Sequence, residues 1–493
     1  MERLSYKTLE NIGYTGYLLK NAPEKVLQFG EGGFLRAFVD HFFDLANEKH
    51  GFGGKTVVIQ PIPQGLADAI NEQDGLYTLY LRGFQDGKTV NDKRIMSCIS
   101  RCINPYKDYQ AFLDCAGNPD LRYIVSNTTE AGIVYEPSST FDQTPPSSFP
   151  AKLTRFLYER FERLGGKGGM VILSCELIDD NGQELRRCVH KYIDQWQLGE
   201  AFRKWVEEEN LFCSSLVDRI ATGYPRAEAD VINEENGYED RLIDTAEVFG
   251  AWVIEGPEWL KEELPFCDGE LPVIVTENHK PYKQRKVRIL NGAHTTMVLG
   301  AYLAGQDIVR DCMKDEVISA YMNKALYEEI IPTLELPKEE LMAFAASVKE
   351  RFANPFIDHQ LLSISLNSVS KWRARCMPSL KAYMERFGSV PPCLAAGLSS
   401  LIAFYRGQRV EDGALIASRP AGNEYPIKDD ASVLSFFLAH KDDAPDELVH
   451  AVLVNADFWG EDLTALTGLE EAVLSGLDCI LNEGAYEAMK RTL

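Results

Sequence analysis

Three hydrogen-bonding side chains of different chemistry lie within the nine residues Lys286–His294. Lys286, Asn291 and His294 supply an amine, a carboxamide and an imidazole, and an apolar helical pattern follows at once. Hydride transfer between a nicotinamide and a secondary alcohol needs a base for the hydroxyl proton and donors that steady the developing alkoxide. A lysine whose pKa is lowered by burial could be that base without a metal ion, and the other two side chains could be the donors.

A more ordinary interpretation of this segment is also open. Lys286 could be a solvated lysine in the basic run 283–288, and Asn291 could cap the helix that follows. Caps and solvated lysines are common in proteins, so the segment alone favours this second interpretation. The choice depends on what the rest of the chain can bring to these residues.

A glycine-rich stretch near the N-terminus has the context of a dinucleotide-binding turn. The apolar run 26–29 leads into Gly30, Gly32 and Gly33, and a helical period begins there. Glycines let the backbone approach a pyrophosphate, and a helix N-terminus supplies N–H groups and positive dipole. The strict pattern G-x-G-x-x-G fails because its last position is Leu35, so a tight turn without a ligand is the alternative. The predicted cofactor-binding residues here are Phe29, Gly30, Gly32, Gly33 and Phe34.

The next predicted strand, 55–60, bears on the choice of cofactor. A dinucleotide-binding domain commonly places an acid at the end of this strand, where it contacts the adenosine ribose. This chain has Gln60 there, followed by Pro61, and the nearest acid is Asp68. Gln60 is therefore a further candidate contact. Because no arginine follows to bind a 2′-phosphate, the sequence favours NAD over NADP.

Polar side chains also follow the predicted strand 122–126. The cluster 127–132 stands at the carboxyl end of that strand, where open α/β sheets bind ligands. Asn127 and Thr128 are therefore also predicted to contact the cofactor. A helix cap by Thr128 or Thr129 explains the cluster equally well.

The remaining pattern of the N-terminal half completes an α/β domain. Alternating runs at 77–82 and 94–99, separated by a loop with Asp86-Gly87, predict an antiparallel hairpin inserted into βαβ units. An amphipathic helix is predicted at 151–164, and a buried strand at 169–176. These elements indicate a Rossmann-like domain with an extended sheet.

The character of the chain changes near residue 280. Helical periods dominate from 291 onward, with clear examples at 317–326, 337–352, 394–405 and 431–438. We therefore expect two domains, a dinucleotide-binding domain at 1–280 and a mainly helical domain for substrate and catalysis at 281–493. Lys286 would then lie near the junction, and ligand clefts favour such junctions.

Composition limits the possible functions. The chain has 493 residues, 45% of them hydrophobic, and a formal net charge of −23, which opposes a nucleic-acid partner. It has no signal-like start and no apolar run of membrane-spanning length, and its eleven cysteines form no C-x-x-C pair. We expect a cytoplasmic, metal-free protein with reduced thiols and no membrane association. The sequence does not indicate an oligomeric state.

Several motifs in one order resemble the long-chain mannitol dehydrogenase family. They are the glycine stretch 29–37, the run Leu216-Val-Asp218-Arg219-Ile220, and the spacing K-x4-N-x2-H that starts at Lys286. The resemblance runs from about residue 25 to about 380. It implies a zinc-independent dehydrogenase, with Lys286 as catalytic base, Asn291 and His294 as the oxyanion-binding pair, and Asp218 near the active site.

Two departures from the family pattern concern the substrate. Glu176-Leu177 stands where mannitol-type members have Asp-Asn, and Ser363 stands where an arginine is common. Within the family, three other segments are most similar to members that act on a uronate; they are 57–61, 126–132 and 174–178. The family alternatives are another ketose or uronate as substrate, or a nucleotide-binding regulatory protein that retained the fold and lost catalysis.

A sugar acid substrate requires a cation in the binding pocket. The segment 371–375 is the best local candidate in an otherwise acidic chain, and it offers Lys371, Arg373 and Arg375. Arginine favours such a role because its fork matches a carboxylate. An exposed basic helix face is the alternative interpretation of the same residues.

Overall fold

The computed structural model describes every residue except 130, 265 and 267–269. The chain divides into two compact units. The first contains residues 1–82 and 90–279, and the second contains residues 83–89 and 280–493. The short segment 83–89 is the tip of a hairpin whose strands begin in the first unit, and nothing in the sequence indicated that it groups with the second unit.

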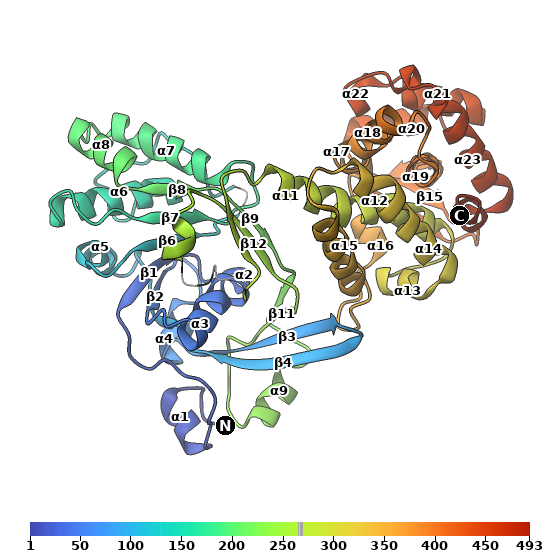
Figure 1. Cartoon of the computed structure of the whole chain (residues 1–493). Helices are drawn as coiled ribbons and strands as arrows, with labels where there is room; N and C mark the ends of the chain where they lie inside the picture. The colour runs from blue at the N-terminus through green and yellow to red at the C-terminus, as the bar shows by residue number, and fades with distance from the viewer. Residues whose placement is uncertain (130, 265, 267–269) are drawn as a thin grey trace. The chain divides into compact units, whose positions relative to one another are not determined.

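A six-stranded parallel sheet forms the centre of the first unit (Figure 1). Its strand order β5-β2-β1-β6-β7-β8 reverses direction beside β1, as in doubly wound dinucleotide-binding domains. The strands are short apolar runs because both faces of the sheet are covered. Their bounds are β1 Glu24–Phe29, β2 Lys55–Ile59, β5 Ile99–Ile103, β6 Tyr123–Ser126, β7 Val171–Ser174 and β8 Leu211–Cys213.

Alternate residues of these strands enter two different hydrophobic clusters. Leu27 and Phe29 pack in one cluster with residues of α6 and α7, whereas Val26 packs in the other with residues of α3. This alternation follows from the two-residue period of a strand. The prediction of a Rossmann-like fold is confirmed. The helices of the first unit are α1 Tyr6–Asn11, α2 Gly33–Ala37, α3 Val39–Lys49, α4 Ala67–Glu72, α5 Tyr109–Asp114, α6 Phe149–Arg163, α7 Asn181–Gln195, α8 Glu200–Glu208, α9 Ala229–Asn236 and α10 Leu260–Glu263, with a 3-10 turn at Cys115–Gly117.

Two smaller sheets extend the first unit. The predicted hairpin is present as β3 Tyr77–Gln85 and β4 Lys88–Met96, and both turn residues, Asp86 and Gly87, have positive φ. Such a two-residue turn suits the twist of paired strands. The hairpin belongs to a sheet of order β10-β11-β3-β4, with β10 Ala221–Gly223 and β11 Asp244–Glu247. The other sheet has the order β13-β12-β9, with β9 Ser215–Asp218, β12 Ala251–Glu255 and β13 Val273–Thr276.

One predicted strand was wrong in its bounds. The run 94–99 is not continuous, because β4 ends at Met96 and the next residues lead into β5 of the parallel sheet. The interruption is explained by one hydrogen bond to a residue that is distant along the chain. The amide of Ser97 donates to Asp44 Oδ1 at 2.9 Å, so it is not available to a neighbouring strand.

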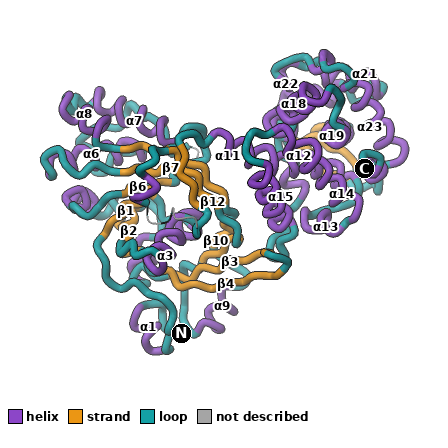
Figure 2. Tube along the Cα trace, viewed as in Figure 1, coloured by secondary structure: helices purple, strands orange, loops and turns teal. Residues whose placement is uncertain are grey.

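The second unit is mainly helical (Figure 2). The helices predicted at 317–326, 337–352, 394–405 and 431–438 are present, whereas a small sheet of order β14-β15-β16 was not predicted. Its elements are α11 Lys280–Arg285, a π turn η2 Lys286–Asn291, α12 Gly292–Leu303, α13 Val309–Lys314, α14 Glu316–Lys324, a π turn at Ala325–Ile330, a 3-10 turn at Ile331–Thr333, α15 Lys338–Phe352, α16 Leu361–Ile364, α17 Ser368–Arg375, α18 Met377–Phe387, α19 Pro392–Phe404, β14 Arg409–Glu411, β15 Ala414–Ser418, β16 Glu424–Ile427, α20 Ala431–Ala439, α21 Pro445–Leu453, α22 Ala456–Trp459, a 3-10 turn at Leu463–Ala465, α23 Leu469–Glu483 and α24 Ala485–Lys490.

Helices α12 and α19 form the interior of the second unit. Nearly every residue of each is buried, which explains why both read as apolar all round rather than on one face. Helix α12 directly follows the segment 286–291, so the candidate catalytic residues are anchored to the core of this unit.

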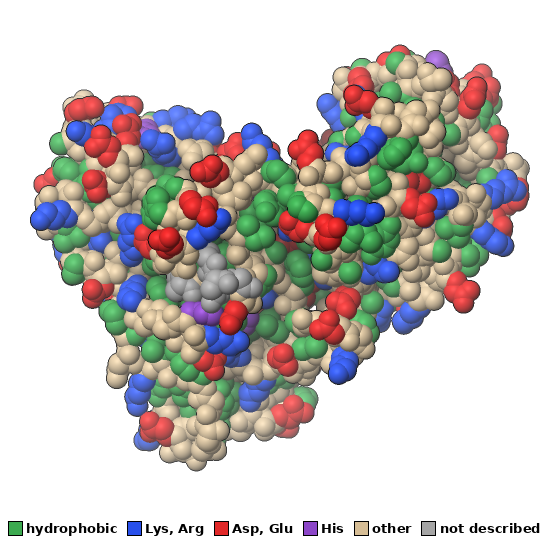
Figure 3. Space-filling view, in the orientation of Figure 1, with side chains coloured by type: hydrophobic (Ala, Val, Ile, Leu, Met, Phe, Trp, Pro, Cys, Tyr) green, Lys and Arg blue, Asp and Glu red, His purple; other side chains and the backbone are tan. Residues whose placement is uncertain are grey.

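Charge on the surface is mixed. Figure 3 shows acidic and basic side chains interspersed over the visible face of the described residues. None of the helices in the described part of the chain combines the length and the apolar character needed to cross a bilayer.

Candidate active site

Lys286 and Asn291 are the first and last residues of the π turn between α11 and α12. On an α-helix, side chains five residues apart diverge by about 140° around the axis. A π turn holds more residues per turn, so it brings these two side chains closer to one face, and such turns are frequent at functional sites. Lys286 is half-buried rather than fully solvated.

Asn291 does not cap the following helix. Its backbone is helical, with φ −74° and ψ −34°, and its side chain makes no capping hydrogen bond. The helix therefore continues through Asn291 into α12. The capping interpretation of the sequence is wrong, because the helix starts earlier than the apolar pattern suggested.

His294 lies in the first turn of α12 and is packed between two aromatic rings. Its imidazole stacks on Phe352, with ring centroids 3.9 Å apart and an angle of 7°, and stands edge-on to His359 at 5.4 Å. Burial lowers the pKa of His294 well below its ordinary value, so the ring is neutral near pH 7. Its Nε2 atom is buried without a hydrogen-bond partner among the described residues, which leaves this atom able to bind a ligand.

Four positively charged or titratable groups act on His294. After burial, they are the next causes of its lowered pKa, in the order His359, Arg351, Arg375 and Lys371. They come from the end of α15, from the segment after it, and from α17. Cations near a neutral, half-buried imidazole form a site suited to an anionic ligand.

The structure separates the three predicted substrate cations. Lys371 and Arg375 are four residues apart on α17, so they share a face, and both act on His294. Lys371 Nζ donates to the Ile364 carbonyl at 2.9 Å, and Arg375 Nη1 donates to Thr295 Oγ1 at 3.3 Å. Burial lowers the pKa of Lys371 and of Arg375.

Arg373 is exposed and is not among the groups that act on His294. A side chain added at Gly460 would overlap its guanidinium, so Arg373 packs against the turn after α22. The alternative interpretation, an exposed basic face, describes Arg373 and does not describe the other two cations.

Arg351 and His359 were missed from the sequence. Arg351 is the next-to-last residue of a correctly predicted helix, but it lies more than fifty residues from His294 along the chain. No spacing rule links the two positions, because only the packing of α15 against this segment brings them together. His359 is not part of any sequence motif, so no pattern in the sequence pointed to it.

The glycine turn of the first unit begins directly after β1. Gly30 has φ +118°, and a Cβ there would lie 3.2 Å from Leu35 Cδ1 and 3.4 Å from the Asn127 carbonyl. Only glycine suits this combination of backbone angle and space. Around Gly32, by contrast, a Cβ would meet nothing within 4 Å, so the backbone there is open to a close approach.

Leu35 replaces the third glycine of the dinucleotide pattern without blocking the turn. It is buried in the cluster that contains Phe38 and Val39, and the helix breaks at Phe38, where φ is −120° and ψ is −74°. The Leu35 side chain lies beside the turn, where a Cβ at Gly30 would be 3.2 Å from Leu35 Cδ1.

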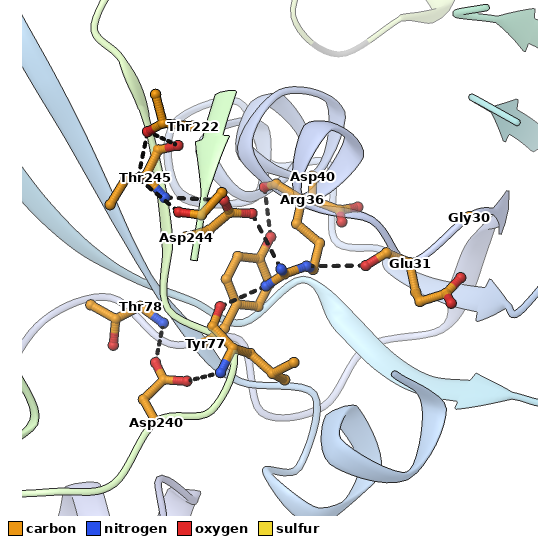
Figure 4. A network of polar contacts seen from close by, with 12 residues as sticks. Gly30, Glu31, Arg36, Asp40, Tyr77, Thr78, Thr222, Asp240, Asp244 and Thr245 are labelled. Carbon is orange, nitrogen blue, oxygen red and sulfur yellow. Dashed lines mark hydrogen bonds and ion pairs between the residues drawn. The ribbon is translucent and has the colours of Figure 1, made fainter. Parts of the chain in front are cut away.

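Arg36 fixes the glycine turn by hydrogen bonds and an ion pair (Figure 4). Its Nε donates to the Glu31 carbonyl at 3.1 Å, its Nη1 donates to the Leu242 carbonyl at 2.6 Å, and its Nη2 lies 3.4 Å from Asp244 Oδ2. Asp244 is fully buried, and a Cβ at Gly33 would lie 3.1 Å from its Oδ1. Burial raises the pKa of Asp244 to about 6, against the opposing effect of Arg36.

Gln28 also fixes the glycine turn by hydrogen bonds. Its Nε2 donates to the Gly30 carbonyl at 3.1 Å and to Asp40 Oδ2 at 3.2 Å. Burial raises the pKa of Asp40 to about 7. The turn is therefore fixed at Gly30 and at Glu31 before any ligand arrives, which lowers the cost of ordering a phosphate-binding loop.

Not every residue that was predicted to bind the cofactor has a side chain that could contact it. The ring of Phe29 is fully buried beside Phe112 and Phe149, so only its backbone can meet a ligand. Phe34 is half-buried and stacks on Phe38 at 5.2 Å.

Gln60 uses its carboxamide to shape its own loop. Its Nε2 donates to the carbonyls of Ile62 at 2.8 Å and Pro63 at 3.0 Å, and its Oε1 accepts from the Ala67 amide at 3.2 Å. The Gln60 carboxamide, which was predicted to contact the adenosine ribose, is therefore already hydrogen-bonded within its own loop.

Asn127 and Thr128 stand at the end of β6, as predicted. The Thr128 amide and hydroxyl both donate to Glu176 Oε1, at 3.1 and 3.0 Å. The interpretation as a helix cap is wrong, since the next helix is α6 and its cap is Ser148. Glu130, part of the same polar cluster, lies outside the described residues.

Asp218 is the buried last residue of β9, and Arg219 follows it. Arg219 Nη1 donates to the Ala37 carbonyl at 2.7 Å, and its Nε donates to the Phe249 carbonyl at 2.9 Å. Burial lowers the pKa of Arg219 to about 10. Arg219 thus joins the break between α2 and α3 to the turn before β12, which is a structural role.

The donor set of the described residues offers no three His, Cys, Asp or Glu side chains close enough to hold a metal ion together. A metal-free reaction stays a prediction. The glycine turn, its open backbone at Gly32 and the reversal of strand order beside β1 fit a nicotinamide dinucleotide.

Two family models match the chain in order. The mannitol dehydrogenase Rossmann domain matches residues 24–267, and the mannitol dehydrogenase C-terminal domain matches residues 278–481. Among curated proteins, the altronate oxidoreductases of Klebsiella pneumoniae and Escherichia coli are each 46% identical over 493 residues, covering 98% of this chain and 99% of theirs.

Two solved structures are similar along nearly the whole chain. A substrate-free D-sorbitol dehydrogenase has a TM-score of 0.81 at 22% identity, covering 99% of this chain and 100% of its own. Mannitol 2-dehydrogenase of Pseudomonas fluorescens, in a ternary complex with NAD and D-mannitol, has a TM-score of 0.67 at 21% identity, covering 99% of each chain. At these identities the likeness establishes the fold, while the sequence matches along both units show that the chain belongs to the mannitol dehydrogenase family.

Proposed function

We propose that the protein is an NAD-dependent oxidoreductase that interconverts D-tagaturonate and D-altronate. The observation that carries this proposal is the gathering of Lys371, Arg375 and Arg351 around neutral His294, in a chain whose net charge is −23. An acidic protein that concentrates cations at one half-buried imidazole is suited to a substrate with a carboxylate. The altronate oxidoreductases among its relatives support the same substrate.

Lys286 is the proposed general acid and base. In the reductive direction, its ammonium gives a proton to the sugar carbonyl oxygen, and in the oxidative direction its amine removes the proton from the hydroxyl. Asn291 and His294 donate hydrogen bonds to that oxygen while it carries negative charge. His294 can do so because a neutral imidazole keeps one N–H and its Nε2 is buried without a partner among the described residues. The dinucleotide, when bound, supplies or accepts the hydride at C4 of its nicotinamide.

The substrate carboxylate is assigned to Arg375 and Lys371, with Arg351 as a further cation. Arginine can bind both carboxylate oxygens through its planar fork, and partial burial strengthens the pairing. Arg373 is exposed, so we withdraw it from this role. Asp218 stays a proposed neighbour of the reaction through the family motif alone.

The cofactor contacts are assigned to the first unit. Gly32 and Gly33 would bring backbone to the pyrophosphate, with Gly30, Asn127 and Thr128 beside it and the rim formed by Phe34 and the backbone of Phe29. Residues 1–280 would thus bind the dinucleotide and residues 281–493 the sugar acid. Gln60 would act indirectly, by shaping the loop that follows β2.

Lys286→Ala tests the proposed chemistry. We expect turnover to fall by about 10²–10⁴-fold, which is the usual contribution of a general acid or base. NADH binding, measured by fluorescence, should stay near that of the parent. The matched control is Lys280→Ala, which removes an exposed lysine from the preceding helix and should retain turnover. Full turnover of Lys286→Ala at neutral pH would show that the base is wrongly assigned.

A substrate panel tests the assignment of the sugar acid. NADH oxidation is followed with D-tagaturonate, D-fructuronate and D-fructose at equal concentrations, and we expect the first to give the highest kcat/KM. A preference for fructose, as in a mannitol 2-dehydrogenase, would refute the carboxylate site, whereas a preference for fructuronate would refute only the choice of uronate. Binding of NADH with no consumption on the whole panel would indicate a regulatory protein.

A further inference from the structure

The carboxylate of Glu31 reaches the end of β2 from the turn that follows β1. Glu31 belongs to the glycine turn after β1. A Cβ added at Gly65, in the loop after β2, would overlap Glu31 Oε1 and would lie 2.6 Å from Gln60 Cδ. The Glu31 carboxylate, the Gln60 side chain and the backbone of Gly65 therefore meet in one small space. That space adjoins the position where dinucleotide-binding domains usually place an acid.

Glu31 is held in this place from two sides. Its backbone carbonyl accepts a hydrogen bond from Arg36 Nε at 3.1 Å, and its side chain is buried under the loop. Figure 4 shows its side chain directed away from Arg36 and from the buried acids around it. Burial raises the pKa of Glu31, while its own amide, the amide of Leu66 and Arg36 oppose that shift.

The loop beside Glu31 offers no cation. Residues 61–75 contain no lysine or arginine, and they include Asp68, Glu72 and Asp74. Lys107 approaches this segment, but it pairs with Asp68 at 2.7 Å, and both side chains are largely exposed. A 2′-phosphate placed here would meet negative charge, and the loop 61–75 would supply no lysine or arginine to balance it.

We propose that Glu31 selects NAD over NADP, by accepting a hydrogen bond from the adenosine 2′-hydroxyl and by repelling a 2′-phosphate. This inference rests on the proposed function, in which the glycine turn binds the dinucleotide. Dinucleotide-binding domains usually place the acid that contacts the adenosine ribose at the end of β2, whereas here this acid belongs to the turn after β1. Gln60 is neutral and shapes the loop, and Gly65 leaves room for the carboxylate, because any side chain there would displace it.

The test is a comparison of two dissociation constants within each variant. NADH and NADPH are titrated into the full-length chain and followed by fluorescence. The parent should bind NADH more tightly, and Glu31→Gln should reduce the ratio of the two constants by about tenfold, a change of about 1.4 kcal/mol. Asp68→Asn removes an exposed acid from the same region and should leave the ratio within about twofold of the parent's.

The outcomes separate this inference from the proposed function. A ratio unchanged in Glu31→Gln would overturn the selection by Glu31 and leave the proposed function standing. A parent that prefers NADPH would overturn this selection and also the choice of NAD in the proposed function. Failure of the parent to bind either dinucleotide would overturn the proposed function together with this inference. Thermal unfolding reports whether Glu31→Gln is folded. Should it not be, Glu31→Ser provides the same comparison, since it removes the carboxylate from a turn that tolerates small residues.

Discussion

Each unit contains a cluster of charged groups, buried in the first unit and mostly half-buried in the second, and the two clusters have opposite sign. In the first unit, Asp40, Asp240 and Asp244 lie buried near Arg36, and burial raises the pKa of all three acids. In the second unit, cations surround His294, and burial lowers the pKa of that imidazole. Desolvation opposes charge in both places, so it acts in opposite directions on acids and on bases.

The partners of the two clusters show what each one does. Around the glycine turn, the polar groups bond mainly to backbone. Asp240 accepts from the amides of Thr78 at 2.7 Å and Leu242 at 2.8 Å, and Arg36 donates to two carbonyls. Such a cluster positions the chain. The Nε2 atom of His294 is buried without a hydrogen-bond partner among the described residues, and so are Asp40 Oδ1 and Asp244 Oδ2 in the first cluster. The second cluster differs in having several cations near a neutral ring, and this excess of positive charge suits an anionic ligand.

Removing Arg36 should give the largest loss of stability. Arg36→Met leaves Asp244 buried without its cation, and breaking a buried ion pair in this way costs about 3–5 kcal/mol. The measurement is the free energy of unfolding in urea. The double variant Arg36→Met/Asp244→Asn should recover part of the loss, because it also removes the uncompensated carboxylate. Losses that simply add in the double variant would show that the two groups do not interact.

Arg375→Met should damage the second cluster without unfolding the protein. We expect kcat/KM for the uronate to fall by about 100-fold, or about 2.7 kcal/mol, since a charge-assisted bond to the carboxylate is lost. Arg373→Met is the matched control on the same helix and should change kcat/KM by less than about threefold, because Arg373 is exposed. Equal losses in the two variants would contradict the separation of these arginines.

Most of the fold could be predicted from local patterns. The strands at 26–29, 55–60 and 122–126 are apolar runs that end in glycine or polar residues, and such signals are short in range. The division of 94–99 into β4 and β5 could not be predicted in this way. It depends on Asp44, which is distant along the chain and takes the amide of Ser97.

The residues of the candidate site also divide into those that local sequence predicted and those that it did not. Lys286, Asn291 and His294 are close in sequence, and their spacing indicated a common role once it was combined with the other motifs that resemble the family. Asp244, Arg351 and His359 belong to the two clusters only through tertiary packing, and a single sequence carries no signal of that packing. The helix 368–375 shows an intermediate case. Three cations were proposed from composition, and only the helical period shows that the middle one faces away from the other two.

Asp40→Asn should produce the smallest effect, and its sign distinguishes the acidic cluster from the cationic one. The pKa of Asp40 is raised from 3.8 to about 7 in the folded chain, so the folded state holds this proton more tightly than the unfolded state. The contribution to stability is present below the unfolded pKa and is lost as pH rises toward 7. Asparagine cannot ionise, so the variant should gain stability relative to the parent between pH 6 and 8, by about 1 kcal/mol. Urea unfolding at the two pH values measures this gain. A gain that is larger at pH 6 than at pH 8 would mean that Asp40 is charged and favourably paired in the folded protein, and the contrast between the two clusters would then fail at this residue.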